Sequence, residues 1–328
     1  MKRRQSRAIT MLLAALLLIG ALAGCGGGNN PQPSAEPTSM KDLKIGVLKG
    51  PTALGAVKII ENEDQYGSVE VIASPDDMAA KFISGQVNIA AVPTNLAAVL
   101  YKKTEGNTRV LAINTLGVLY ILSSDDSVKS IADLRGKTIY TSGQGSTPEY
   151  ILNDLLQKNG LTPGADVTVE YRSEHAEVAA LAAAGTAEVI MVPEPFVTSI
   201  TGKTPEMKIA VDMTQAWKEA NGDVPLVMGC IVAKADVDDA QIQAFLKEYQ
   251  ASTTFANEEV EETARIIGEA DIMAEAVVKS ALPRCNITYL AGDEMKSAME
   301  TFLTALYEAN PKSVGGEMPQ ADFYYGAQ

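Results

Sequence analysis

The chain has 328 residues, with 27 Lys and Arg against 41 Asp and Glu and a formal net charge of -14. This length exceeds one typical hydrophobic core and suits two, and the negative charge excludes a nucleic-acid-binding role because it repels phosphate backbones. Hydrophobic residues make up 46% of the chain and charged residues 21%, as in folded globular proteins. Three cysteines and one histidine provide no zinc cluster, so we expect neither a metal nor a cofactor.

Residues 1–24 have the pattern of a signal peptide. Four of the first seven residues are basic, and without them the chain keeps 23 basic against 41 acidic residues, a net charge of -18. The apolar run Met11–Ile19 is shorter than the roughly 20 residues that a membrane-spanning helix needs. Leu22-Ala23-Gly24-Cys25 then resembles the lipobox of bacterial lipoproteins. We expect Cys25 to be lipidated; the alternative is an ordinary secretory signal with an incidental cysteine.

Residues 25–40 are predicted to be a disordered tether. The segment is rich in Gly, Pro and polar side chains, and it has almost nothing to bury. A coil of this length reaches about 20 Å. We therefore expect the folded part to lie outside the cytoplasm, held at the cell membrane by the lipid but not embedded in it.

From residue 41 onward, short apolar runs alternate with amphipathic stretches, among them the predicted helices Thr52–Asn62 and Thr94–Lys103. This alternation predicts an α/β fold with largely parallel strands. Gly85–Asn95 matches Gly185–Pro195 one hundred positions later, each containing a buried run and a Val-Pro pair. The Gly-containing turns at 50–52 and 143–148 also follow matching predicted strands. The repeat predicts two lobes built on one plan.

Two apolar runs are predicted to connect the lobes. Leu116–Ser123 is expected to be one continuous strand, and Val224–Ala233 follows the second lobe. The chain then passes from lobe I to lobe II and back, with lobe I at 41–120 plus 226–328 and lobe II at 121–225. Only helices are expected after residue 239, completing lobe I. Such a clam-shell binds ligands at the strand carboxyl ends, where helix N-termini converge.

Several stretches resemble the nitrate/sulfonate/taurine and thiamine-precursor group of ABC-importer substrate-binding proteins, the NMT1-like or SsuA/TauA-like family. They are Leu43–Gly55, Ala90–Asn95, Ile131–Ile139 and Val192–Phe196. The resemblance implies a two-lobed type II periplasmic-binding-protein-like fold with two hinge crossovers. It also implies a monomer that captures a small solute, closes by hinge bending and delivers the solute to ABC permease and ATPase subunits.

The candidate ligand-binding residues lie at predicted helix starts. Lobe I contributes the pairs Pro51 and Thr52, then Thr94 and Asn95; lobe II contributes Gly143, Gln144, Ser146, Thr147, His175, Glu194 and Phe196. Free N–H groups at a helix start favour an acceptor or an anion, although Thr52 could equally be a helix cap. Glu194 could be purely structural, and His175 could be a cap or a surface residue.

The predicted cleft loops contain no obvious Arg or Lys. Together with Glu194, this favours a neutral or zwitterionic heteroaromatic or amine ligand slightly over nitrate. Gly143 and Gly145 allow close backbone approach, but no Gly-Lys-Ser/Thr follows, so the turn is not a nucleotide-binding loop. Cys230 and Cys285 could form a disulfide or be two buried thiols.

No catalytic residues are predicted, because the sequence contains neither a Gly-x-Ser-x-Gly nor a His-Glu-x-x-His motif. The leading hypothesis is therefore a binding protein that makes and breaks no covalent bond. Two alternatives stay open: an enzyme built on the same scaffold, and a ligand sensor that signals to a membrane partner.

Overall fold

The protein is described by a computed structural model for residues 38–327. The predicted signal peptide, the lipidation site Cys25 and the predicted tether up to residue 37 lie outside the described residues. Among residues 38–327, no helix combines the length and the apolar character that crossing a membrane requires.

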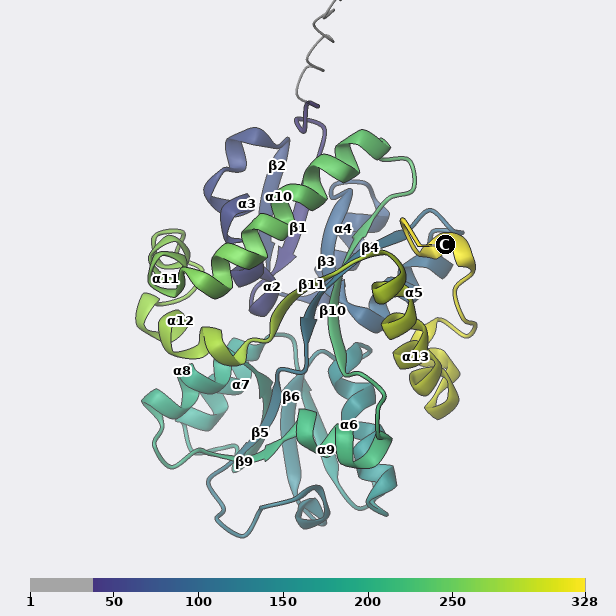
Figure 1. The fold of residues 1–328 in the computed structure, drawn as a ribbon. Coiled ribbons are helices and arrows are strands. Elements are labelled where there is room, and N and C mark those ends of the chain that lie inside the picture. The colour runs from purple at the N-terminus through teal and green to yellow at the C-terminus, as the bar shows by residue number, and fades with distance from the viewer. Residues whose placement is uncertain (1–37, 328) are drawn as a thin grey trace, which may run out of the picture. The chain divides into compact units, whose positions relative to one another are not determined.

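Lobe I, which we define by its six-stranded sheet, has the strand order β11-β4-β10-β3-β1-β2 (Figure 1). The strands are β1 (Lys44–Leu48), β2 (Ser68–Ile72), β3 (Ile89–Pro93), β4 (Arg109–Leu116), β10 (Val227–Ala233) and β11 (Ile287–Leu290). β1 is parallel to β2 and β3, whereas β10 runs antiparallel to β3 and β4.

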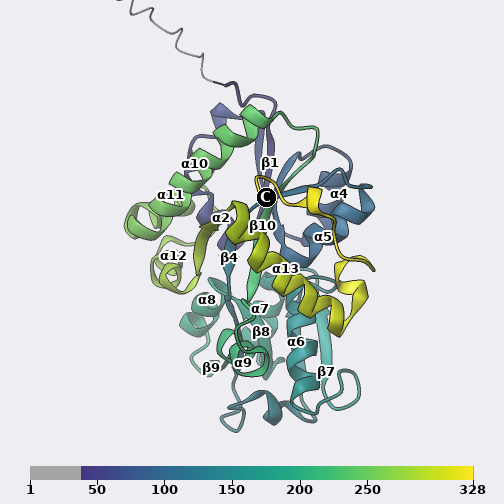
Figure 2. The same cartoon turned by 45° about the vertical axis from the view of Figure 1, so that its right-hand side comes forward.

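Helices cover both faces of this sheet (Figures 1 and 2). On one face lie α2 (Pro51–Gly55), α3 (Val57–Glu61), α10 (Asp239–Glu258), α11 (Val260–Glu269) and α12 (Glu275–Ala281). On the other lie α4 (Pro75–Ile83), α5 (Thr94–Lys103) and α13 (Gly292–Ala309).

Lobe II, defined by its five-stranded sheet, has the order β7-β6-β8-β5-β9. Its strands are β5 (Leu119–Ser123), β6 (Thr138–Ser142), β7 (Thr168–Arg172), β8 (Val189–Pro193) and β9 (Lys208–Asp212). Its main helices are α6 (Thr147–Lys158), α7 (His175–Ala183), α8 (Phe196–Lys203) and α9 (Met213–Asn221).

The repeat seen in the sequence corresponds to one strand arrangement used twice. β6 is parallel to β7 and β8, as β1 is to β2 and β3. β3 and β8 each end in a proline and each pair with an antiparallel strand: Pro93 lies opposite Gly229, and Pro193 opposite Leu119. Equivalent strands of the two lobes therefore end at equivalent prolines.

The chain changes sheets between β4 and β5 and again between α9 and β10. The expectation of one continuous strand over Leu116–Ser123 is wrong, because pairing with lobe I ends at Leu116 and pairing with lobe II begins at Leu119. Gly117 lies at this break, where a side chain would collide with Thr214 of α9. The apolar run hid the break because both flanking strands are buried.

Two other expectations from periodicity need correction. The predicted helix over 52–62 is two short helices, α2 and α3, and Gly55 packs beside Tyr249 and Ile287 where they meet. The expectation of helices alone after residue 239 missed β11, whose four residues pair with β4 far back in the chain. Such distant pairing leaves little local signal.

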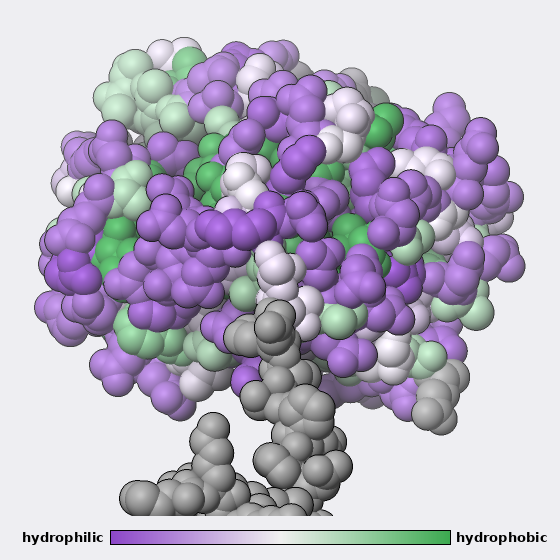
Figure 3. All heavy atoms as spheres, turned by 90° about the horizontal axis from the view of Figure 1, so that it is seen from above, coloured by the Kyte–Doolittle hydropathy of each residue, from purple (hydrophilic) through white to green (hydrophobic). Residues whose placement is uncertain are grey.

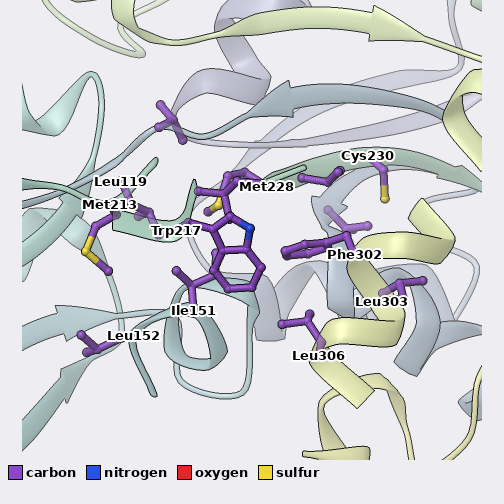
Figure 4. Packing of buried hydrophobic residues seen from close by; sticks show 14 of the residues in the cluster. Leu119, Ile151, Leu152, Met213, Trp217, Met228, Cys230, Phe302, Leu303 and Leu306 are labelled. Carbon is purple, nitrogen blue, oxygen red and sulfur yellow. The ribbon is translucent and has the colours of Figure 1, made fainter. Parts of the chain in front are cut away.

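One hydrophobic cluster runs from lobe I into lobe II through α13 (Figure 4). The single tryptophan, Trp217 on α9, is 1% exposed and lies 5.6 Å from Phe302 of α13, measured between ring centroids. Its indole N–H donates to the carbonyl of Val224 at 3.0 Å. α9 leads directly into the second crossing, so this packing stabilises the side where the lobes are joined.

Seen from above, the end of lobe I is covered mainly by hydrophilic residues, with hydrophobic residues only in small separate groups (Figure 3). The hydrophobic contacts of the two lobes lie inside the protein, in clusters on both faces of each sheet. No broad apolar surface is presented on this face.

Candidate functional site

A cavity lies where the parallel strands of both lobes end and helices begin. Its volume is about 90 Å³, and it is lined by Leu48, Lys49, Pro51, Thr52, Val92, Pro93, Thr115, Val118, Leu119, Pro148, His175, Pro193, Met228 and Gly229. These residues come from both lobes, and Val118 lies in the first crossing. Their position matches the general rule that α/β sheets bind ligands beyond the carboxyl ends of their strands.

Three predicted residues, Pro51, Thr52 and His175, line this cavity. Thr52 is not a helix cap: the cap position is Gly50, and the Thr52 hydroxyl donates to the Leu48 carbonyl at 2.6 Å. The hydroxyl still has acceptor capacity for a ligand, because one donated bond leaves its lone pairs in place.

His175 lies at the start of α7, against the ring of Phe196 at 4.9 Å between centroids. Its Nδ1 is 2.6 Å from the Ser142 hydroxyl. Burial in the crevice lowers the pKa of His175 to about 4, because desolvation disfavours the charged imidazolium. At neutral pH the ring is therefore uncharged, and it offers a hydrogen-bonding nitrogen and an apolar ring face.

Asn95 and Thr147 face each other across the lobes but do not line the cavity. Asn95 N donates to Thr147 Oγ1 at 3.1 Å, and Thr147 Oγ1 donates to Asn95 Oδ1 at 3.0 Å. The Asn95 amide also donates to the carbonyls of Gly145 and Ser313 at 3.1 and 3.0 Å. Both side chains are fully buried, so in this arrangement they join the lobes to each other.

Glu194 forms a second contact between the lobes. Its fully buried carboxylate accepts from Arg284, with Nε at 2.8 Å and the closest terminal nitrogen at 2.6 Å. The N–H and hydroxyl of Thr198 also donate to it, at 3.0 and 3.1 Å. Arg284 comes from the 3-10 helix η3 (Leu282–Arg284) after α12, on the lobe I side. In this arrangement the Glu194 carboxylate is committed to protein donors.

The remaining predicted residues do not belong to the lining of this cavity. Gly143 and Gln144 line a separate groove of about 420 Å³ with the start of α4. Ser146 donates to the Gly143 carbonyl at 2.5 Å, which shapes the turn. Thr94 follows Pro93 and is fully buried, yet its hydroxyl has no hydrogen-bond partner within the described part of the chain.

Sequence reasoning missed several lining residues. Thr115, Met228 and Gly229 lie on the strands that cross between the lobes, and only the fold brings them to the helix starts. Thr115 is 2% exposed, and among residues 38–327 its hydroxyl finds no partner. Lys49 lines the edge of the cavity and corrects the expectation that the cleft loops lack a lysine. The sequence signal that could have identified Lys49 is its place directly before Gly50-Pro51, at a predicted helix start.

Within residues 38–327 there is no group of three or more His, Cys, Asp or Glu side chains arranged to hold a metal ion. Cys230 and Cys285 are both buried and free, so the disulfide alternative is not realised. Burial raises the pKa of both thiols, which makes them poor nucleophiles.

The two-lobed α/β fold, crossed twice and enclosing a cavity at the helix starts, is that of type II periplasmic binding proteins. The chain belongs to the family whose model is described as menaquinone biosynthesis, which matches residues 52–308. Among curated proteins none matches it.

Solved structures with the same fold include an ABC transporter protein from Parabacteroides distasonis, 26% identical, with a TM-score of 0.72; the alignment covers 86% of this chain and 98% of that one. The alkanesulfonate-binding protein SsuA from Xanthomonas axonopodis pv. citri, bound to MOPS, is 15% identical at a TM-score of 0.68 (87% and 97% covered). The periplasmic nitrate-binding protein NrtA from Synechocystis is 18% identical at 0.62 (83% of each chain). The predicted resemblance to this class of binding proteins is thus confirmed.

Proposed function

We propose that this protein is the solute receptor of an ABC importer. It captures a small molecule in the cavity between its lobes and hands it to the permease, while the ATPase subunits drive transport. The observation that carries the proposal is the cavity itself, because both lobes and the first crossing contribute residues to it. A ligand held there makes contacts with both lobes, so it favours the arrangement in which they are closed.

The same proposal includes a lipid on Cys25 and a monomeric state. It also includes the lobe bounds, with lobe I at 41–120 plus 226–328 and lobe II at 121–225. A lipid anchor outside the cytoplasm keeps the receptor near the permease without a spanning helix. The ligand classes carried by the resemblance are sulfonate, nitrate or taurine-like anions and aminopyrimidine or thiamine-precursor-like rings. Proteins that bind alkanesulfonate and nitrate share the fold, which supports the role more strongly than the ligand class.

The second candidate is an enzyme, because the matching family is described by a biosynthetic pathway. The paired polar groups for such chemistry are His175, which lines the cavity, and Ser142, whose hydroxyl is bonded to it. The depressed pKa of His175 leaves it a weak base. Two buried thiols with raised pKa values add no nucleophile, so we place binding first.

The test is recovery of the solute. The full chain, purified in mild detergent, is analysed by native mass spectrometry, and the compound that it releases on denaturation is identified and added back. We expect one small compound per chain, recovered with its mass unchanged after prolonged incubation. Conversion of the compound at a constant rate would establish the enzyme instead, and loss of uptake on disruption of the adjacent permease gene would support transport.

A further inference from the structure

Four of the helix starts near the cavity, those of α2, α5, α6 and α8, offer fewer free N–H groups to an anion than the unblocked start of α7 at His175. Anion sites at helix N-termini depend on free backbone N–H groups. Pro51 and Pro148, in the first turns of α2 and α6, have no N–H. In α5 the N–H of Asn95 is taken by Thr147, and in α8 the N–H of Thr198 is taken by Glu194.

Charge around the cavity also opposes an anion. The buried carboxylate of Glu194 is paired with Arg284 at 2.6 Å, so this arginine is not free to attract an anion at the start of α8. A separate groove reaches Glu174, the residue before His175, and its lining contains Asp76, Asp77 and Glu174 against the single basic residue Arg172, which already pairs with Glu170 at 3.5 Å. The cation in the cavity lining is Lys49. Because Lys49 is exposed, water screens its attraction to an anion.

The walls of the cavity instead suit an apolar body. The apolar side chains in the lining are Leu48, Val92, Val118, Leu119 and Met228. Each lobe also contributes two prolines, Pro51 and Pro93 from lobe I and Pro148 and Pro193 from lobe II. Two polar groups, those of Thr115 and His175, belong to the same lining. The Thr115 hydroxyl is buried and unpaired among residues 38–327, and a buried unpaired hydroxyl gains free energy when a ligand atom satisfies it. The uncharged imidazole of His175 supplies the other.

We propose that the cleft selects a compact, uncharged solute with a largely apolar body and at least one hydrogen-bonding atom, and that it discriminates against small oxyanions. This inference rests on the proposed receptor function. A preference for an uncharged solute would distinguish this protein from the structural relatives named for alkanesulfonate and nitrate. We attribute the weak binding of oxyanions to the helix starts whose N–H groups are missing at a proline or already bonded within the protein.

The experiment compares probes matched in shape and different in charge: benzamide with benzoate, and butanesulfonamide with butanesulfonate, with nitrate as the smallest oxyanion. Binding to the full chain in mild detergent is measured by calorimetry. We expect the uncharged member of each pair to bind at least tenfold more tightly, and nitrate to give no measurable heat. Tighter binding of benzoate, butanesulfonate or nitrate would overturn the inference and leave the receptor function standing.

If none of the probes binds, the charge of the solute recovered by mass spectrometry decides. An uncharged solute supports the inference, an oxyanion overturns it, and recovery of no solute from any preparation removes the proposed function and the inference together. Thr115→Val should weaken binding of the preferred probe or solute at least tenfold. Thr263→Val is the matched control, since Thr263 on α11 is also buried, its hydroxyl has no partner in the described part of the chain, and it lies outside the cavity lining. Equal losses in both variants would contradict the role of Thr115.

Discussion

Asn95 and Thr147 exchange two hydrogen bonds across the boundary between the lobes, one from the Asn95 backbone and one from the Thr147 hydroxyl. Both residues are predicted to bind ligand, and in this arrangement their side chains hold the lobes together. The helix starts of α5 and α6 thus meet beside the cavity, where a ligand would lie. Contact between the lobes and ligand capture are therefore coupled through neighbouring residues.

Replacing Thr147 with Val should favour separation of the lobes. The change removes one acceptor and one donor from the fully buried Asn95, at a cost of about 1–3 kcal/mol. Small-angle X-ray scattering of ligand-free protein should show a larger radius of gyration than in the parent. Thr141→Val is the control, because Thr141 is equally buried but its hydroxyl donates to Met191 within lobe II. An identical scattering curve for Thr147→Val and the parent would contradict this role.

Arg284→Met should destabilise the protein by about 1–3 kcal/mol, because it leaves the buried Glu194 carboxylate with only the Thr198 donors. Urea unfolding measures the loss, and adding Glu194→Gln should recover part of it. Arg265→Met serves as the control, since its partners Glu262 and Glu269 are exposed and such pairs contribute less than about 1 kcal/mol. Equal losses in the two arginine variants would show that Glu194 gains nothing from its partner.

His175 predicts a specific pH dependence of stability. Its pKa is near 4 in the folded state against 6.5 in the unfolded chain, so the unfolded state binds more protons between these values. Stability contributed by the neutral ring is present above about pH 6.5 and is lost as the pH falls toward 4. The loss amounts to about 3 kcal/mol at most.

Urea unfolding of the parent and of His175→Gln, at intervals from pH 4.5 to 7.5, isolates this contribution, since the other titrating groups are common to both. The free-energy difference between the two proteins should grow with pH up to about 6.5 and then level off. A difference that stays flat across the range would show that His175 titrates normally in the folded state.

Trp217 should report on packing between the lobes, because it is the only tryptophan and is buried against Phe302 (Figure 4). Phe302→Ala should cost about 3–5 kcal/mol and shift the emission of the folded protein to longer wavelength. Phe245→Ala, which removes a fully buried ring on α10, should lose similar stability with no shift. A shift of the same size in both variants would contradict the local assignment.

Much of the fold followed from local pattern. α5 begins and ends where its spacing predicts, at Thr94 and Lys103, and the Val-Pro repeat placed β3 and β8 because both are buried runs that end at a proline. What failed depends on distant partners. The break at Gly117 is imposed by Thr214, almost one hundred residues later, and β11 exists because β4 offers it an edge.

The site divides in the same way. Proximity to a helix start identified Pro51, Thr52 and His175, which line the cavity. The same rule could not distinguish ligand-facing positions from Asn95 and Glu194, whose partners come from the other lobe. Thr115 could not be predicted as a site residue from the sequence, because it lies inside a buried strand. Only the structure shows that its hydroxyl lacks a partner among residues 38–327.

The central claim is that a solute is held between the two lobes at the ends of their parallel strands. A crystal structure of the full chain with the recovered solute tests it most directly. We expect one chemically unchanged solute molecule in contact with Thr115 and His175 and with residues of both lobes. A solute bound only in the surface groove beside Val71, or on one lobe alone, would contradict it.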